Sequence, residues 1–163
     1  MTEKLNLFDY DRKALESYFA DIGEKSFRAH QLLKWIYQHG IINIESMSNL
    51  SNDLRAYLKE NTSVKLPEII TEKKSKDGTK KWLIKVDEKN SIETVFIPEN
   101  DRGTLCISTQ VGCALDCKFC STAQQGFSRN LTTSEIIGQV WAANKILGHF
   151  ENGKRMITNI VFM

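Results

Sequence analysis

The stretch from Thr104 to Met163 constrains the fold most, because it reads as strand, loop, helix and strand in that order. "TLCISTQ" and "MITNIVFM" are strand-like runs. Between them, "TTSEIIGQVWAANKILG" is typical of a helix that Thr132 and Glu135 begin with a capping box and Gly148 ends. Strand, helix and strand form a βαβ unit, which predicts a parallel sheet buried on both faces.

The rest of the chain divides at a change of period. Residues from about 9 to 62 have helical spacing, with Asp9 or Asp11 and then Ser26 as helix starts. From Leu66 the period becomes two, and Asp77-Gly78 is a strong hairpin turn signal. We therefore predict an α/β chain with a helical domain at 1–65, a hairpin and strand connector at 66–103, and the βαβ region at 104–163.

Composition excludes several classes of protein. The net charge is only +2 over 163 residues, so any nucleic-acid surface must be local. We find no signal peptide and no apolar run long enough to span a bilayer. A reducing, cytoplasmic compartment is therefore expected, where clustered cysteines are more often metal or redox ligands than disulfides.

Three of the four cysteines lie in "CALDCKFC", at Cys113, Cys117 and Cys120. Structural zinc usually takes four ligands, often as two separated pairs, whereas three crowded thiolates suit an iron–sulfur cubane with one iron left open. Cys106 lies in a strand-like run seven residues before Cys113, yet it could complete a four-cysteine zinc site. Incidental buried thiols are the third reading.

"CALDCKFC" resembles the cysteine loop of the radical S-adenosylmethionine superfamily. The wider string "TLCISTQVGCALDCKFCSTAQQGFSRNLTTSEI" closely resembles one family within it, the RlmN dual-specificity RNA methyltransferases. "SFRAHQLLKWIYQHG" and "IETVFIPENDRGTLC" also look like the N-terminal part of that family. The resemblance implies that residues 104–163 begin a partial TIM barrel.

The resemblance implies two cofactors, a 4Fe–4S cluster and S-adenosylmethionine. Cys113, Cys117 and Cys120 match the cluster ligands. Phe119 matches an aromatic residue beside the adenosylmethionine, although plain core packing is an equal reading from the sequence alone.

The resemblance also implies the reaction, which is methylation of adenine carbon two in large-subunit ribosomal RNA and in transfer RNA. Glu93 matches the proton acceptor, and Cys106 matches a cysteine that forms a disulfide with a second, methyl-carrying cysteine. An external electron donor such as flavodoxin, a monomeric state for the full-length protein and no membrane partner are further expectations.

The methyl-carrying cysteine of the family is not among the four cysteines of this chain. The glycine-rich adenosylmethionine segment, expected after "NIVFM", is missing too. We therefore expect the chain to be the N-terminal portion of a family member and not to methylate RNA by itself.

Basic side chains supply two further hypotheses. Five lysines surround the hairpin tip, either to hold phosphates or simply as a solvated edge: Lys73, Lys74, Lys76, Lys80 and Lys81. Arg129, in the family string, is a better candidate for a site role. The alternative to the methyltransferase is a non-catalytic RNA-binding module with structural zinc on Cys106, Cys113, Cys117 and Cys120.

Overall fold

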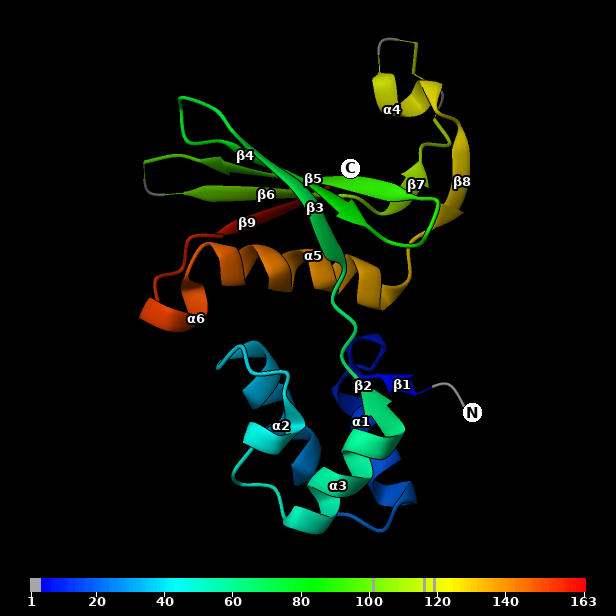
Figure 1. Cartoon of the computed structure of the whole chain (residues 1–163), viewed down its shortest axis with the longest axis vertical. Coiled ribbons are helices and arrows are strands. Elements are labelled where there is room, and N and C mark those ends of the chain that lie inside the picture. Colours follow the sequence, from blue (N-terminus) through cyan, green and yellow to red (C-terminus); the bar gives the residue numbers. More distant parts are fainter. Residues whose placement is uncertain (1–3, 101, 116, 119) are drawn as a thin grey trace. The chain divides into compact units, whose positions relative to one another are not determined.

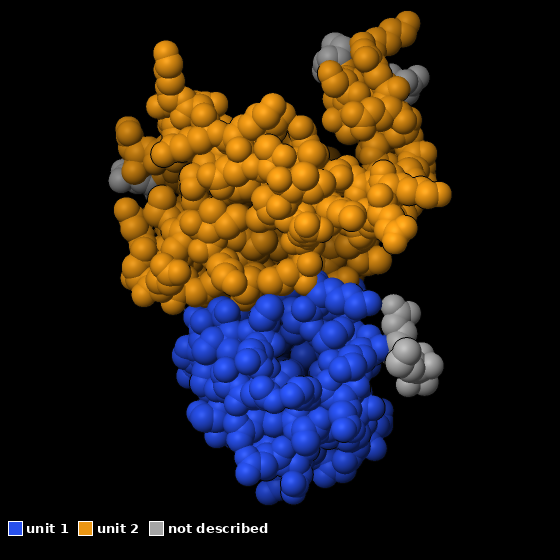
Figure 2. Space-filling model, in the orientation of Figure 1, with its two compact units in different colours: residues 1–65 blue, residues 66–163 orange. Residues whose placement is uncertain are grey.

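The computed structural model describes residues 4–100, 102–115, 117–118 and 120–163. Two compact units make up the chain, residues 1–65 and residues 66–163 (Figure 2). The strands of the predicted connector, residues 66–103, lie in the same unit as the βαβ region. Each unit has its own buried core.

The first unit is helical. Its main helices are α1 (Arg12–Asp21), α2 (Phe27–Tyr37) and α3 (Asn52–Asn61), with short 3-10 turns η1 (Leu7–Asp9) and η2 (Ile44–Ser46). Strands β1 (Leu5–Asn6) and β2 (Thr62–Ser63) pair in parallel. The largest fully buried side chains of this unit are apolar: Leu7, Phe8, Leu15, Phe19, Leu32, Ile36, Met47 and Leu58.

Capping residues explain where these helices begin. The Asp11 carboxylate accepts a hydrogen bond from the Ala14 N–H at 2.8 Å, which confirms one of the two predicted starts of α1. Ser51 caps α3 in the same way. Ser26 precedes α2 as predicted, but its side chain makes no capping bond and its backbone is already helical.

The second unit contains a five-stranded sheet in the order β3-β4-β5-β6-β9. The strands are β3 (Glu68–Lys74), β4 (Lys80–Lys85), β5 (Ser91–Pro98), β6 (Gly103–Ile107) and β9 (Asn159–Phe162). The β3–β4, β4–β5 and β5–β6 pairs are antiparallel, and β6 and β9 are parallel. Between β6 and β9 the chain forms α5 (Thr133–Ile146) and α6 (His149–Asn152). The βαβ prediction and the α/β class are therefore confirmed.

Helix α5 lies along one face of this sheet (Figure 1). The core between them contains Trp82, Ile84, Phe96, Leu105 and Ala143. All four residues of β9 are exposed, so the expectation of a parallel sheet buried on both faces is wrong for the described residues. The reason is that the hairpin strands join the sheet antiparallel and α5 covers one side of it.

A small hairpin stands beyond the end of β6. Strands β7 (Gln110–Gly112) and β8 (Phe127–Asn130) pair antiparallel, and the short helix α4 (Ser121–Gln124) lies between them in the chain. Figure 1 shows α4 at one end of this unit. Sequence periodicity predicts only a loop here, because three- and four-residue elements are too short to show a period.

Helices long and apolar enough to cross a bilayer do not occur in the part of the chain that the structure describes.

Candidate active site

Glu93 and Cys106 lie on the same face of the five-stranded sheet. Cys106 of β6 is the register partner of Val95 on β5. Because side chains alternate along a strand, Glu93 and Val95 share the face of Cys106, while Thr94 and Leu105 point to the α5 side. Two residues matched to catalytic roles thus occupy neighbouring strands on the face that α5 leaves uncovered.

Glu93 is half-exposed and forms an ion pair with Lys81 of β4. Lys81 Nζ lies 2.8 Å from Glu93 Oε1, and the two side chains are 45% and 49% exposed. At that exposure the pair adds little to stability. Its effect is to restrain the Glu93 carboxylate at the surface of this face.

Cys106 is a free, partly buried thiol. Its register neighbours are Val95 on β5 and Val161 on β9, so apolar residues lie on both sides of it in the sheet. This position in the middle of a sheet differs from that of the other three cysteines, which lie in one loop.

The cysteine loop runs from Cys113 to Cys120, between β7 and α4. The Cys113 N–H donates to the Gly126 carbonyl at 3.2 Å, and the Cys120 N–H donates to the Cys117 carbonyl at 3.0 Å. All three thiols are free and partly buried. The β7–β8 ladder therefore holds the base of a loop whose thiols are available as ligands.

Gly112 makes this base possible. Its φ is +73°, and a Cβ added there would lie 1.7 Å from the Gly126 carbonyl oxygen. A left-handed residue with no room for a side chain must be glycine. The end of β7 and the residue before β8 can approach each other only because of it.

The thiols fit an iron–sulfur cluster in the chemistry of their surroundings. The Leu115 N–H donates to Cys113 Sγ at 3.5 Å, and N–H bonds to thiolate sulfur stabilise and tune such clusters. Backbone N–H groups of Ala123 and Thr122 lower the pKa of the Cys120 thiol. In the described residues no three Cys, His, Asp or Glu side chains are already gathered as a metal site.

Phe119, expected beside the adenosylmethionine, lies outside the described residues.

Gln139 of α5 is a residue that sequence reasoning missed. It is fully buried, its Oε1 accepts from Thr94 Oγ1 at 2.8 Å and from the Ser108 N–H at 2.9 Å, and its Nε2 donates to the carbonyls of Ser108 and Glu135. The available signal was a polar residue on the apolar side of a helix. Such a residue is costly to bury without partners and so indicates a network.

Arg129 of β8 joins two elements of the same unit. Its guanidinium makes two hydrogen bonds to Glu135, at 2.8 and 2.9 Å, and one to Asp87 at 2.8 Å. Hydrogen bonds to these carboxylates raise the pKa of Arg129 above its usual value. The structure thus shows Arg129 as a clamp between α5 and the turn after β4.

The hairpin lysines fall into two groups. Lys80 and Lys81 form ion pairs: Lys80 Nζ lies 3.7 Å from Glu72 Oε1, and Lys81 pairs with the Glu93 carboxylate. Lys73, Lys74 and Lys76 are exposed around the turn. The exposed group remains suited to phosphate contact.

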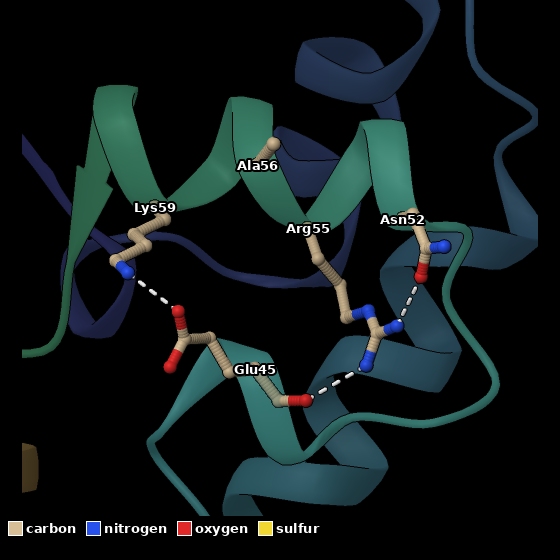
Figure 3. Close-up of a pocket in the computed structure, with 5 residues that line it drawn as sticks. All are labelled: Glu45, Asn52, Arg55, Ala56 and Lys59. Atoms are coloured by element: carbon tan, nitrogen blue, oxygen red, sulfur yellow. Dashed lines mark hydrogen bonds and ion pairs between the residues drawn. The ribbon is translucent and has the colours of Figure 1, made fainter.

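A pocket of about 400 Å³ lies in the helical unit (Figure 3). It is lined by Glu45, Asn52, Arg55, Ala56 and Lys59. Arg55 donates to the Glu45 carbonyl and to Asn52, and Lys59 pairs with the Glu45 carboxylate. The charged groups satisfy one another, so the pocket resembles a surface network more than a ligand site.

Three comparisons bear on family. Residues 5–64 match the family model described as the ribosomal RNA large subunit methyltransferase N-terminal domain. The chain is 56% identical over 160 residues to a dual-specificity RNA methyltransferase RlmN from Alkalilimnicola ehrlichii, covering 98% of this chain but 43% of that relative. A radical SAM methyltransferase from Sphaerobacter thermophilus matches in structure with a TM-score of 0.83 and 34% identity, over 97% of this chain and 47% of that one.

The chain therefore spans less than half the length of the relatives it matches, and the match runs through both of its units. By sequence and by fold, it corresponds to the N-terminal portion of the RlmN-type radical SAM methyltransferases.

Proposed function

We propose that this chain supplies part of the active site of a radical SAM RNA methyltransferase that forms 2-methyladenine in ribosomal and transfer RNA. The observation that carries the proposal is the shared face of Glu93 and Cys106, on strands that a loop with three free thiols follows in the chain. The 56% sequence identity to a dual-specificity RNA methyltransferase RlmN supports the proposal.

Cys113, Cys117 and Cys120 would hold a 4Fe–4S cluster, leaving one iron for S-adenosylmethionine. When bound, the cluster supplies the single electron that cleaves the adenosylmethionine, chemistry that ordinary side chains cannot provide. The loop would present the three thiolates together, because the β7–β8 pairing holds its base. Backbone N–H groups directed at sulfur would stabilise the thiolates.

Glu93 would accept the proton that leaves adenine carbon two, on its carboxylate oxygen. Lys81 orients that carboxylate in the absence of substrate. Cys106 would form the disulfide with the methyl-carrying cysteine, while the bond from that cysteine's sulfur to the carbon on the RNA breaks and this carbon takes up a proton to become the methyl group. The free Cys106 thiol lies on the same face as Glu93, and thiol exchange needs a thiolate within reach of the attacked sulfur.

RNA would reach this face past the β3–β4 hairpin. Lys73 lies opposite Lys81 in the register, and both belong to the face that carries Glu93. Positive charge therefore extends from the hairpin toward the proposed proton acceptor, as a phosphate contact requires. An external electron donor such as flavodoxin and a reducing cytoplasm complete the proposal.

The test is methylation by a full-length version of the protein. The cluster is reconstituted in the absence of air, and the protein is then incubated with adenosylmethionine, a strong reductant and ribosomal or transfer RNA. We expect mass spectrometry to detect 2-methyladenine. Cys106→Ala should instead accumulate a protein–RNA adduct that survives denaturation. Normal turnover of Cys106→Ala without adduct would contradict the role of Cys106, and a colourless zinc protein without methylation would favour the RNA-binding module.

A further inference from the structure

We propose that Gln139 is a positioning residue, which fixes the spacing between Glu93, Cys106 and the start of the cysteine loop. Its catalytic meaning rests on the proposed function above. Its geometric basis rests only on hydrogen bonds from α5 to the middle of β5 and to the residue that follows β6.

The first part of the argument concerns Ser108. It lies just beyond Ile107, the last residue of β6 with a register partner on β9. Both backbone groups of Ser108 bond to the Gln139 amide, the N–H to Oε1 and the carbonyl to Nε2, each at 2.9 Å. One side chain thus replaces the strand partner that the backbone would otherwise need there.

Ser108 is also the point where the functional segments separate. Cys106 is two residues before it, β7 begins two residues after it, and the cysteine loop follows β7. Its hydroxyl donates to the Glu93 carbonyl at 2.7 Å. A shift of Ser108 would therefore move the backbone of all three proposed functional segments.

The second part concerns β5. Thr94 is fully buried and follows Glu93 directly, and its hydroxyl donates to the same Oε1 that accepts from Ser108. The Nε2 of Gln139 donates in addition to the Glu135 carbonyl, one turn earlier on α5. The amide is therefore bonded to β5, to the end of β6 and to its own helix.

Only an amide of this length satisfies the set, because donor and acceptor capacity are both used. Methionine has similar length but would leave the buried Thr94 hydroxyl and the part-buried N–H and carbonyl of Ser108 without their partner. Glutamate keeps the accepting oxygen but loses the donors when ionised. The expected consequence is local displacement, and a displacement of about 1 Å in an active site can lower a rate about 100-fold.

The first test is kinetic, in a full-length version of the protein. Gln139→Met should lower kcat for RNA methylation about 10- to 100-fold, with KM for RNA within about twofold of wild type. Gln139→Glu, whose ionised carboxylate would face the carbonyls of Ser108 and Glu135 without a donor, should also lower kcat. The matched control is Ile84→Val or Ile84→Ala, whichever has the melting temperature of Gln139→Met. Ile84 lies in the same core but bonds to none of these groups.

The control should keep the wild-type kcat at a temperature where every variant is folded. If Gln139→Met kept kcat as well, or lost no more than the Ile84 control, the positioning role would be wrong.

The second test measures amide hydrogen exchange in the 163-residue chain and needs no activity. In Gln139→Met the Ser108 amide should exchange at least about tenfold faster, while the amides of the β4–β5 ladder should stay as in wild type. Equal protection of Ser108 in both proteins would refute the clamp. If the wild-type enzyme methylated nothing, the proposed function would fail, and exchange would still decide whether Gln139 fixes Ser108.

Discussion

The two faces of the five-stranded sheet are made by the same strands but differ in content. The face toward α5 carries the buried core, including Trp82, Leu105 and Phe96. The other carries Lys81, Glu93 and Cys106, which are only partly buried. Two adjacent residues of one strand therefore differ in role. The residue on the α5 side stabilises the core, and the residue on the other face carries the proposed chemistry.

Gln139 lies on the core side and is the exception that links the two. It is as buried as the apolar residues around it, yet its bonds reach the backbone that carries the other face. The comparison predicts that the two faces respond differently to substitution.

The largest effect is expected on the core side. Leu105→Ala should lower the free energy of unfolding by about 2–5 kcal/mol, because Leu105 is fully buried. Its neighbour Cys106→Ala, on the other face, should cost about 1 kcal/mol or less. Urea denaturation of the 163-residue chain measures both, and equal losses would remove the distinction between the faces.

A smaller effect is expected at the Arg129 clamp, which supports the core side at the start of α5. Burial raises the pKa of Glu135, but hydrogen bonds from Arg129 and the Thr132 N–H outweigh it, so the pKa is lowered. The Asn90 amide and then Arg129 lower the pKa of Asp87. Both carboxyls are therefore more acidic folded than unfolded.

The sign of the pH dependence follows from these two shifts. A lowered folded pKa gives stability that is present above the unfolded values, about 4 for Asp and Glu, and is lost as the pH falls through the folded values. Arg129→Met should cost about 1–2 kcal/mol near neutral pH and should flatten the acid limb below about pH 5. Melting temperatures measured from about pH 7 to about pH 3 provide the check, with Arg12→Met as an exposed control. An unchanged acid limb would show that Arg129 is not the group that holds these carboxyls charged.

The smallest effect on folding is expected at the hairpin. Replacing Lys73, Lys74 and Lys76 with Ala should leave stability nearly unchanged but weaken RNA binding. Each lost phosphate contact should reduce the slope of log K against log salt by up to about 0.9, the value for a duplex. Lys13→Ala with Lys25→Ala, two exposed lysines of the helical unit, forms the control. An unchanged slope in the hairpin variant would show that these lysines are a solvated edge and do not contact phosphate.

Local signals predicted the parts of the fold that local chemistry decides. Thr132 and Glu135 form the capping box expected from the sequence. Asp77 and Gly78 form the hairpin turn, with Gly78 at φ +87° and the Asp77 carboxylate accepting from Thr79. The order of β6, α5 and β9 followed from periodicity and length.

The remaining features depend on residues far apart in the chain. Gln139 meets Ser108 and Thr94 across 31 and 45 residues, and Arg129 meets Asp87 across 42. No local pattern encodes such pairs. The polar Gln139 on the apolar side of a helix could indicate that a network exists, but the sequence could not name its partners or those of Arg129. It could place Glu93 and Cys106 on strands, but only the register shows that they share a face.

We propose that the three loop cysteines form one ligand set, whereas Cys106 lies apart from them on β6. Anaerobic reconstitution of the 163-residue chain with iron and sulfide, followed by metal analysis and absorbance, tests it directly. We predict about four irons and four sulfides per chain, complete loss of the brown absorbance in Cys117→Ala, and full retention in Cys106→Ala. Loss of the cluster in Cys106→Ala as readily as in Cys117→Ala, or a colourless protein that binds zinc through all four cysteines, would contradict it.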